Sequence, residues 1–164
     1  MIYFLAMLSV FLRLLPHEPN FAPLGALALL AGTTGNLRKI WLPLAAVVAT
    51  DAVLGFYSGM AWVYLSYGIL FFTGYFCRRA SRPGKQIGLP LAGSVLFFLV
   101  SNFGVWASGS MYPATLTGLG QCFAAGLPFF RNTAVSDLLY FNAFAALAAF
   151  MGWLAAVRRA PAQA

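Results

Sequence analysis

Long blocks of apolar residues constrain this chain more than any other feature of its sequence. Hydrophobic residues make up 62% of its 164 positions and charged residues only 8%, whereas a soluble domain carries roughly 25% charged residues. Unpaired backbone polar groups are very costly in lipid, so such blocks predict transmembrane α-helices. They are also too continuous for the alternating strands of an outer-membrane barrel. We therefore expect an all-α membrane protein.

The number and length of the apolar blocks predict a six-transmembrane-helix bundle in a single domain covering residues 1–164. A span needs roughly 20 residues, so the chain has room for about six short ones. The blocks place the helices at about residues 1–15, 20–35, 40–56, 61–76, 89–107 and 133–157. The first block has neither the basic n-region nor the A-x-A site of a cleavable signal, so we expect it to remain as a helix.

Glycine and proline residues interrupt the apolar stretch 108–131. They are Gly109, Pro113, Gly118, Gly120, Gly126 and Pro128. Proline removes a backbone donor and glycine weakens a helix, so this stretch is not expected to cross the membrane as a seventh span. We expect residues 114–130 to form an amphipathic or re-entrant segment on the outer face.

Clustered basic residues predict the orientation of the chain. Cytoplasmic loops of membrane proteins are enriched in lysine and arginine. Eight of the ten basic residues here are Arg38 and Lys39, those of the loop from Arg78 to Lys85, and Arg158 and Arg159. With six spans these groups share one side, so both termini are expected in the cytoplasm, with the protein in a bacterial inner membrane. The net charge of +7 then reports topology, and no nucleic-acid partner is expected.

Residues 15–23 form an unusual connector between two apolar blocks. It holds the sole histidine, His17, one of three acids, Glu18, and three of nine prolines. Proline fixes φ and lacks an N–H, so this stretch cannot belong to one regular helix. We expect a stiff, extended segment that holds His17, Glu18 and Asn20 together at the lip of a binding site.

The predicted topology gathers polar side chains in the outer half of the bundle. Asp51 and Asp137 lie within two turns of outer helix ends, and Asn102 and Trp106 share one helix face. Ionisable groups at membrane depth usually face a cavity or a partner, and such a pocket suits a polar, ring-bearing small molecule. The candidate ligand-binding residues are His17, Asn20, Asp51, Tyr57, Tyr64, Asn102, Trp106, Arg131 and Asp137.

Each candidate also has a structural interpretation. Asp51 could pair with Arg13 or Arg131 to lock helices together. Asp137 could face the dipole at the N-terminus of its own helix, and Asn20 could be the N-cap of the second helix. Trp106, Tyr57 and Tyr112 are also the residue types of an interfacial aromatic belt.

Metal and cofactor chemistry finds little support in the sequence. Cys77 and Cys122 are isolated thiols without CxxC spacing, so they predict neither a disulfide framework nor a metal site and are expected to be inert. His17 alone is a weak metal-ligand candidate. We expect no cofactor.

Three classes of function remain open. The first is a solute-binding or transport protein. The second is an integral-membrane enzyme that uses His17 with Glu18, Asp51 or Asp137 as acid–base groups, although the sequence holds no P-loop, HExxH or GxSxG motif. The third is a structural or assembly subunit, favoured by the small-residue spacings Ala45/Ala49 and Ala145/Ala149.

Four sequence blocks, at residues 15–29, 51–57, 102–106 and 127–133, resemble a family of small, largely uncharacterised bacterial membrane proteins. That family is similar to the six-helix S components of energy-coupling-factor vitamin transporters, and most of all to the solitary cobalamin-uptake type called BtuM. The resemblance implies a substrate pocket under the outer loops, lined by His17, Asp51 and Arg131. The cobalt-ligating cysteine of that type has no counterpart among Met60, Trp62 and Tyr64, so His17 would be the substitute ligand.

The resemblance also implies partners and a mode of action. An S component binds a vitamin-like small molecule from the periplasmic side of the lipid bilayer, and the resemblance makes a corrinoid one candidate here. It docks on an energising module made of an ATPase and a scaffold subunit. We expect the first and third outer loops to close over the ligand.

Overall fold

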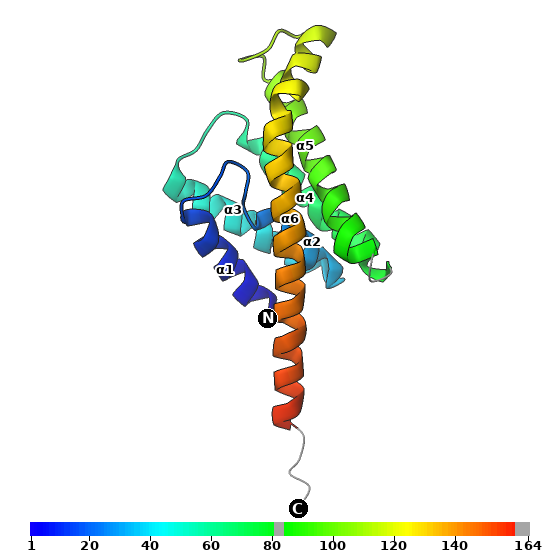
Figure 1. Cartoon of the computed structure of the whole chain (residues 1–164). Helices are drawn as coiled ribbons and strands as arrows, with labels where there is room; N and C mark the ends of the chain where they lie inside the picture. The colour runs from blue at the N-terminus through cyan, green and yellow to red at the C-terminus, as the bar shows by residue number, and fades with distance from the viewer. Residues whose placement is uncertain (81–83, 160–164) are drawn as a thin grey trace, which may run out of the picture.

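In the part of the chain that the structure describes, six α-helices are joined by turns and loops (Figure 1). The computed structural model describes residues 1–80 and 84–159; Arg82 of the predicted basic loop and the side chain of Arg159 lie outside them. The helices are α1 Ile2–Leu14, α2 Leu24–Thr33, α3 Trp41–Leu54, α4 Met60–Phe76, α5 Leu89–Ala107 and α6 Leu116–Arg159. Short helical turns occur at η1 Leu37–Ile40, η2 Cys77–Arg79 and η3 Gly84–Gly88. The predicted all-α fold is confirmed for these residues.

Three helical stretches within the described residues are long and apolar enough to cross a membrane. They are Met60–Arg79, Gly84–Ala107 and Leu116–Arg158. By length and composition, this marks the chain as a membrane protein. The helices α1 and α2 are apolar as well, but with 13 and 10 residues they fall short of the roughly 20 that a straight span needs.

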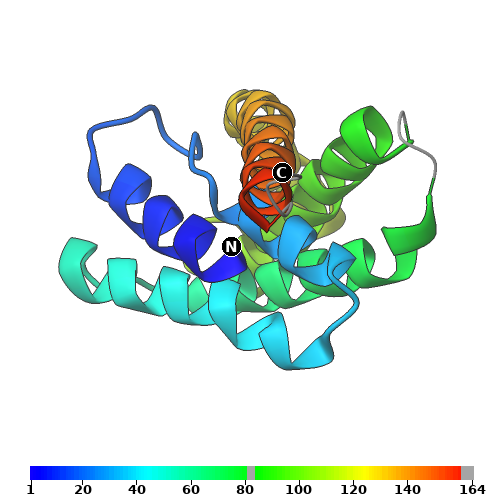
Figure 2. The ribbon, with the colours of Figure 1, turned by 90° about the horizontal axis from the view of Figure 1, so that it is seen from below.

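The short helix α2 forms the centre of the molecule. Its sequence is apolar on every side, which is typical of a helix buried all round. Leu24, Leu27 and Leu29 are fully buried, and α2 contacts each of the other five α-helices of the described chain. Figure 2 shows α2 among its neighbours, with α6 viewed nearly along its axis. The core of the fold is therefore built around residues 24–33.

Two glycines allow α2 and α4 to pack backbone against backbone. A Cβ added at Gly32 of α2 would overlap the carbonyl oxygen of Phe71, and one added at Gly74 of α4 would overlap that of Leu29. Small residues at helix crossings permit this close approach inside membranes. The α2–α4 contact thus depends on the absence of a side chain at both positions.

A matched pair of glycine variants in α4 tests this contact. Gly74→Ala should lower the free energy of unfolding by about 1–3 kcal/mol, because the added methyl group pushes two backbones apart. Gly68→Ala should leave stability unchanged or raise it by about 1 kcal/mol, since apart from its chain neighbours and the adjacent backbone of its own helix no described atom lies within 4 Å of its Cβ position, and alanine favours the helix. Denaturant titration in detergent measures both, and equal stabilities would contradict the close packing.

The last helix differs from the prediction. Residues 114–130 were expected to form an outer re-entrant segment, with a separate helix at 133–157. Instead, α6 runs as one helix of 44 residues from Leu116, through Pro128, to Arg159. At 1.5 Å per residue it is about 66 Å long, roughly twice the thickness of the hydrocarbon layer of a membrane. Figure 1 shows its C-terminal part extending beyond the rest of the fold.

Glycines in this stretch allow neighbouring groups to pack closely and do not interrupt the helix. A Cβ at Gly126 would overlap the side-chain oxygen of Asn102 on α5, and one at Gly118 would overlap the carbonyl oxygen of Pro113. Phe98 of α5 packs against Phe123 and Phe130, with ring centroids 5.4 and 5.1 Å apart. Contacts with α5 therefore stabilise a helix that its composition alone disfavours.

The second helix begins later than predicted, at Leu24 and not near residue 20, and Pro23 is its N-cap residue. The N-cap role considered for Asn20 is therefore wrong. Asn20 has a φ of 61°, a left-handed conformation that asparagine tolerates better than most residues. It is the third residue of the turn 18–21, in which the Phe21 N–H donates to the Glu18 carbonyl over 2.9 Å.

The loops gather at two ends of the fold (Figure 1). We call the end with the connections 15–23, 55–59 and 108–115 the loop end. We call the opposite end, with the turns η1, η2 and η3, the basic end. There, a Cβ at Gly35 would lie 3.4 Å from the Arg78 side chain, which places the turn after α2 beside the one after α4. The pairs Arg38/Lys39 and Arg78/Arg79 consequently lie at one end.

Candidate functional site

A cavity lies at the loop end. Its volume of about 500 Å³ is within the usual range for small-molecule sites. The end of α1, the connector 15–23, α4, α5, the loop 108–115 and α6 all contribute to its wall. Its polar lining residues are Arg13, His17, Asn20, Tyr57, Tyr67, Ser101, Asn102, Tyr112, Cys122, Thr133 and Asp137. Residues far apart in sequence thus meet at one site.

The cavity brings together five of the nine candidate residues. His17, Asn20, Tyr57, Asn102 and Asp137 line it. The other four, Asp51, Tyr64, Trp106 and Arg131, are outside the set of lining residues in the described chain. Arg131 is exposed. The Trp106 indole N–H donates to the Pro113 carbonyl over 3.1 Å, which braces the loop 108–115.

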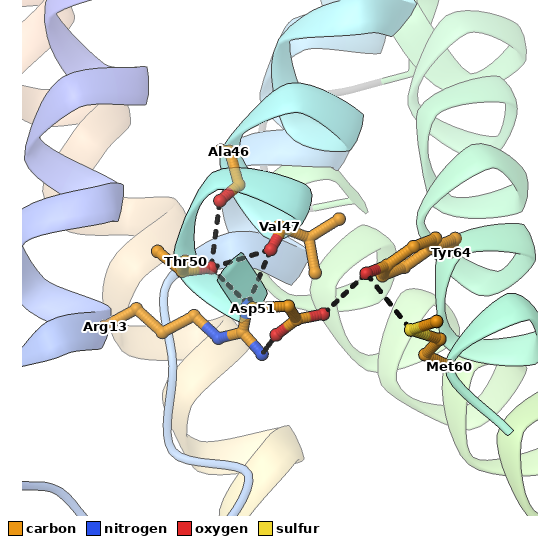
Figure 3. Close-up of polar contacts among 7 residues, drawn as sticks. All are labelled: Arg13, Ala46, Val47, Thr50, Asp51, Met60 and Tyr64. Atoms are coloured by element: carbon orange, nitrogen blue, oxygen red, sulfur yellow. Dashed lines mark hydrogen bonds and ion pairs between the residues drawn. The ribbon is translucent and has the colours of Figure 1, made fainter. Parts of the chain in front are cut away.

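Asp51 belongs to a polar cluster behind the cavity wall (Figure 3). Its carboxylate is 1% exposed and forms an ion pair with Arg13 of α1 over 2.7 Å. The Tyr64 hydroxyl of α4 donates to the other carboxylate oxygen over 2.9 Å. Arg13 also donates to the Thr50 hydroxyl and, over 3.3 Å, to the Val47 carbonyl. This geometry matches the structural interpretation of Asp51, since the cluster ties α1, α3 and α4 together.

Tyr57 connects this cluster to the cavity. It lies in the turn 55–59, which begins and ends with glycines at positive φ, Gly55 at 104° and Gly59 at 87°. Burial, with a further contribution from the Asp51 carboxylate, raises the pKa of Tyr57. The phenol is therefore protonated at neutral pH and can donate a hydrogen bond at the cavity wall.

Asp137 lies at the junction of α2, α5 and α6. Its carboxylate is 1% exposed and accepts a hydrogen bond from the Ser94 hydroxyl over 2.8 Å. It also lies against Gly25, where an added Cβ would overlap it, and the Ala26 amide is within hydrogen-bonding reach. The first turn of α2 has neither an acidic residue nor a side-chain cap of its own. The Asp137 side chain therefore supplies the hydrogen-bond acceptor that the N-terminus of α2 lacks within its own sequence.

This placement corrects the dipole interpretation of Asp137. It was expected near the N-terminus of its own helix, but α6 begins 21 positions earlier, at Leu116. The favourable dipole is that of α2, whose first turn packs against Asp137 on α6. The carboxylate can accept hydrogen bonds from both the start of α2 and the Ser94 hydroxyl, because it has about four lone-pair sites.

The connector 15–23 is fastened to α6 at the edge of the cavity. Asn132 donates to the Pro19 carbonyl over 3.0 Å, and Ser136 donates to the Ala22 carbonyl over 3.4 Å. His17 Nδ1 lies 3.0 Å from the Glu18 carbonyl oxygen. A carbonyl only accepts, so Nδ1 carries the proton and Nε2 of the neutral ring is an acceptor. The connector is thus held at the edge of the cavity and is not helical, as the prolines predicted, but it contains a turn at residues 18–21 and is not extended throughout.

One wall of the cavity was missed in the sequence. Cys122, Gly126, Phe129, Thr133 and Asp137 all line it from α6, at spacings of three or four residues that mark one helix face. The signal was present, but it crosses Pro128 and was therefore not interpreted as a single helix. Cys122 is 2% exposed and donates to the Asn102 carbonyl over 3.3 Å, so it is part of the cavity wall and not an isolated thiol.

Metal-binding capacity is limited in the described residues. Within residues 1–80 and 84–159, no three His, Cys, Asp or Glu side chains come close enough to hold a metal ion. His17 and Cys122 both line the cavity, but the chemistry available there is mainly hydrogen bonding and aromatic contact.

Fold and site together define a class: an all-helical protein with membrane-type helices and a half-open cavity at the end opposite its basic turns. The chain belongs to a family of unknown function, DUF6580, whose sequence model matches residues 1–162. No curated protein and no solved structure matches the chain.

Proposed function

We propose that the protein spans a bacterial inner membrane six times, with both termini in the cytoplasm and the loop end in the periplasm. The grouping of basic residues at one end supports this orientation through the positive-inside rule. Non-helical backbone is tolerated at membrane depth where it lines a cavity. The connector 15–23 meets that condition, since His17 and Asn20 line the cavity. The connector can therefore lie in the outer part of the membrane, so that α1 and α2, although short, each form one of the six spans.

We further propose that the protein captures a small, ring-bearing nutrient from the periplasm, in the manner of an S component. The main support for this proposal is the cavity of about 500 Å³ at the loop end, with a buried carboxylate in its wall. Ligand sites combine a mostly apolar lining with a few placed polar groups. Tyr67, Phe97 and Phe129 provide the apolar surface, and Asn102 and Asp137 the polar groups. A vitamin-like molecule, with a corrinoid among the candidates, is the proposed cargo. An ATPase-containing module is the proposed energy source.

Alkylation of Cys122 tests this proposal. Cys122 lines the cavity, whereas Cys77 is exposed at the basic end. In a Cys77→Ser background the detergent-purified protein is treated with a small thiol reagent in the presence of vitamins, corrinoids and nucleobases. A cavity ligand should slow alkylation of Cys122 in proportion to its occupancy, because it fills the space that the reagent must enter. The complementary Cys122→Ser protein should show an unchanged rate at Cys77.

His17→Ala sharpens the same experiment. A bound solute that touches the lip should protect Cys122 less well in this variant, while the alkylation rate without solute stays the same. A broad panel in which every compound leaves the rate unchanged would contradict a solute-binding role.

A second candidate is an assembly subunit of a membrane complex, and one observation favours it. The C-terminal part of α6 carries exposed apolar residues, with Phe150 54% and Trp153 59% exposed. An apolar helix face of this kind is a usual site of helix–helix contact in membranes. Co-purification from native membranes distinguishes the two, because only an assembly subunit should lose its partners on Trp153→Ala while keeping the Cys122 protection pattern.

A further inference from the structure

The inner wall of the cavity is formed by α5 and α6 and carries several of its polar groups. Ser101 and Asn102 line it from α5, and Thr133 and Asp137 line it from α6. Whether these groups offer donors or acceptors to a ligand depends on the hydrogen bonds that they already make. In each case the structure shows those bonds.

The donors of this wall are largely engaged within the protein. The hydroxyl groups of Ser101 and Thr133 donate to the carbonyls of Phe97 and Phe129 over 2.7 and 3.0 Å. The Asn102 amide donates to the Phe98 carbonyl over 2.8 Å. A hydroxyl has one proton and two lone pairs, and an amide oxygen has two lone pairs. What remains for a ligand is mainly oxygen lone pairs.

The charged residues at the cavity also favour a ligand that donates hydrogen bonds. Arg13 lines the cavity, but its charge is neutralised by Asp51 at 2.7 Å. Asp137 has no cationic partner in the described chain; its neighbours are the Ser94 hydroxyl and the start of α2. A buried carboxylate without a counter-ion is costly, and a cation placed beside it favours its charged form. The described lining of the cavity therefore offers a ligand the Asp137 carboxylate, while its one arginine, Arg13, is already paired with Asp51.

Aromatic rings complete the environment. Tyr67, Phe97 and Phe129 line the cavity, and the rings of Tyr67 and Phe97 are 5.3 Å apart. The faces of aromatic rings attract organic cations, more strongly when water is excluded. An ammonium group in the cavity would thus be near both oxygen acceptors and aromatic rings.

We propose that the cavity selects an organic cation that donates hydrogen bonds, such as a ring-bearing primary ammonium or a protonated nitrogen heterocycle. This inference rests on the proposed solute-binding function and specifies its ligand class. Asp137 is the charge-reading residue, and Asn102, Ser101 and Thr133 accept further N–H groups. Anionic ligands are disfavoured because the Asp137 carboxylate would repel them, and the Tyr57 phenol, which can donate a hydrogen bond at the cavity wall, carries no positive charge.

Three probes with one ring system test the charge preference. Tryptamine, tryptophol and indole-3-acetate share an indole and carry an ammonium, a hydroxyl and a carboxylate group. Titration of the melting temperature of the full chain in detergent gives a Kd for each. Tryptamine should bind at least about tenfold more tightly than tryptophol, because hydrogen bonds to charged groups are stronger than neutral ones. Indole-3-acetate should bind more weakly than tryptophol.

Variants identify the groups responsible. Asp137→Asn should reduce tryptamine affinity to that of tryptophol, whereas Glu18→Gln, which removes an acid outside the cavity lining, should change nothing. If Asp137→Asn does not fold, Thr133→Val serves instead, and it should weaken tryptamine and leave indole-3-acetate unaffected. Equal or tighter binding of the neutral or anionic probe would overturn the inference, as would failure of all three to bind. Protection of Cys122 by any other solute would still support the proposed function in those cases.

Discussion

Replacing Asp51 with alanine is expected to lower the free energy of unfolding by about 3–5 kcal/mol. The substitution leaves the Arg13 guanidinium, whose side chain is only 13% exposed, without its counter-ion. It also removes the acceptor of the Tyr64 hydroxyl, so three helices lose their shared polar contact. Denaturant titration of the purified protein in detergent measures the loss.

Two controls separate this structural role from ligand binding. Arg131→Ala removes an exposed arginine and should change stability by no more than about 0.5 kcal/mol. The double variant Arg13→Met/Asp51→Leu should be more stable than either single variant, because no buried charge is left alone. If Asp51→Ala folded normally and lost only solute binding, Asp51 would be a ligand-contacting residue and the present account of it would be wrong.

Replacing Asp137 with leucine should lower the free energy of unfolding by about 1–3 kcal/mol. The α2 N-terminus and the Ser94 hydroxyl would both lose a buried acceptor. Asp137→Asn should have a smaller effect, because it keeps one side-chain oxygen. Asp137→Leu should also abolish Cys122 protection by any cationic solute, so this residue affects both the fold and the site.

A double-mutant cycle with Gly25 tests the geometry of this contact. Gly25→Ala should destabilise the protein because its methyl group overlaps the Asp137 carboxylate. In an Asp137→Ala background the same change should be better tolerated, since the overlapping group is absent. The coupling energy between the two sites follows from the four stabilities. Additive effects would mean that the two residues are not in contact.

The helices were the most predictable part of the fold. Apolar blocks placed α5 at residues 89–107, where the structure has Leu89–Ala107, and placed α1 and α4 to within one or two residues at each end. The long continuous α6 was not predicted, because proline and glycine disfavour a helix locally. Gly126 and Gly118 are explained only by the groups that pack on them, Asn102 and Pro113. Such tertiary contacts cannot be read from local composition.

The candidate site was predicted only in part, because it also depends on tertiary contacts. Topology brought His17, Asn20, Tyr57, Asn102 and Asp137 to the loop end, and the structure places all five at one cavity. The predicted topology could not show that Arg13 is the partner of Asp51, since Arg13 and Arg131 were both expected in the outer half. Cys122 was missed because its segment was not assigned to the helix that carries Asp137.

The most direct test of the account is whether the cavity itself is the binding site. Ala125 lines the cavity on α6, and its neighbour Ala124 is exposed and outside the described lining. Ala125→Trp should fill the cavity, whereas Ala124→Trp adds the same side chain beside it. Thermal stabilisation by the most strongly protecting solute of the Cys122 panel is measured for both; a ligand at a hundred times its Kd adds roughly 2.7 kcal/mol of stability. We predict that Ala124→Trp retains this stabilisation and Ala125→Trp loses it. Equal stabilisation of the two variants would contradict the assignment of the cavity as the solute-binding site.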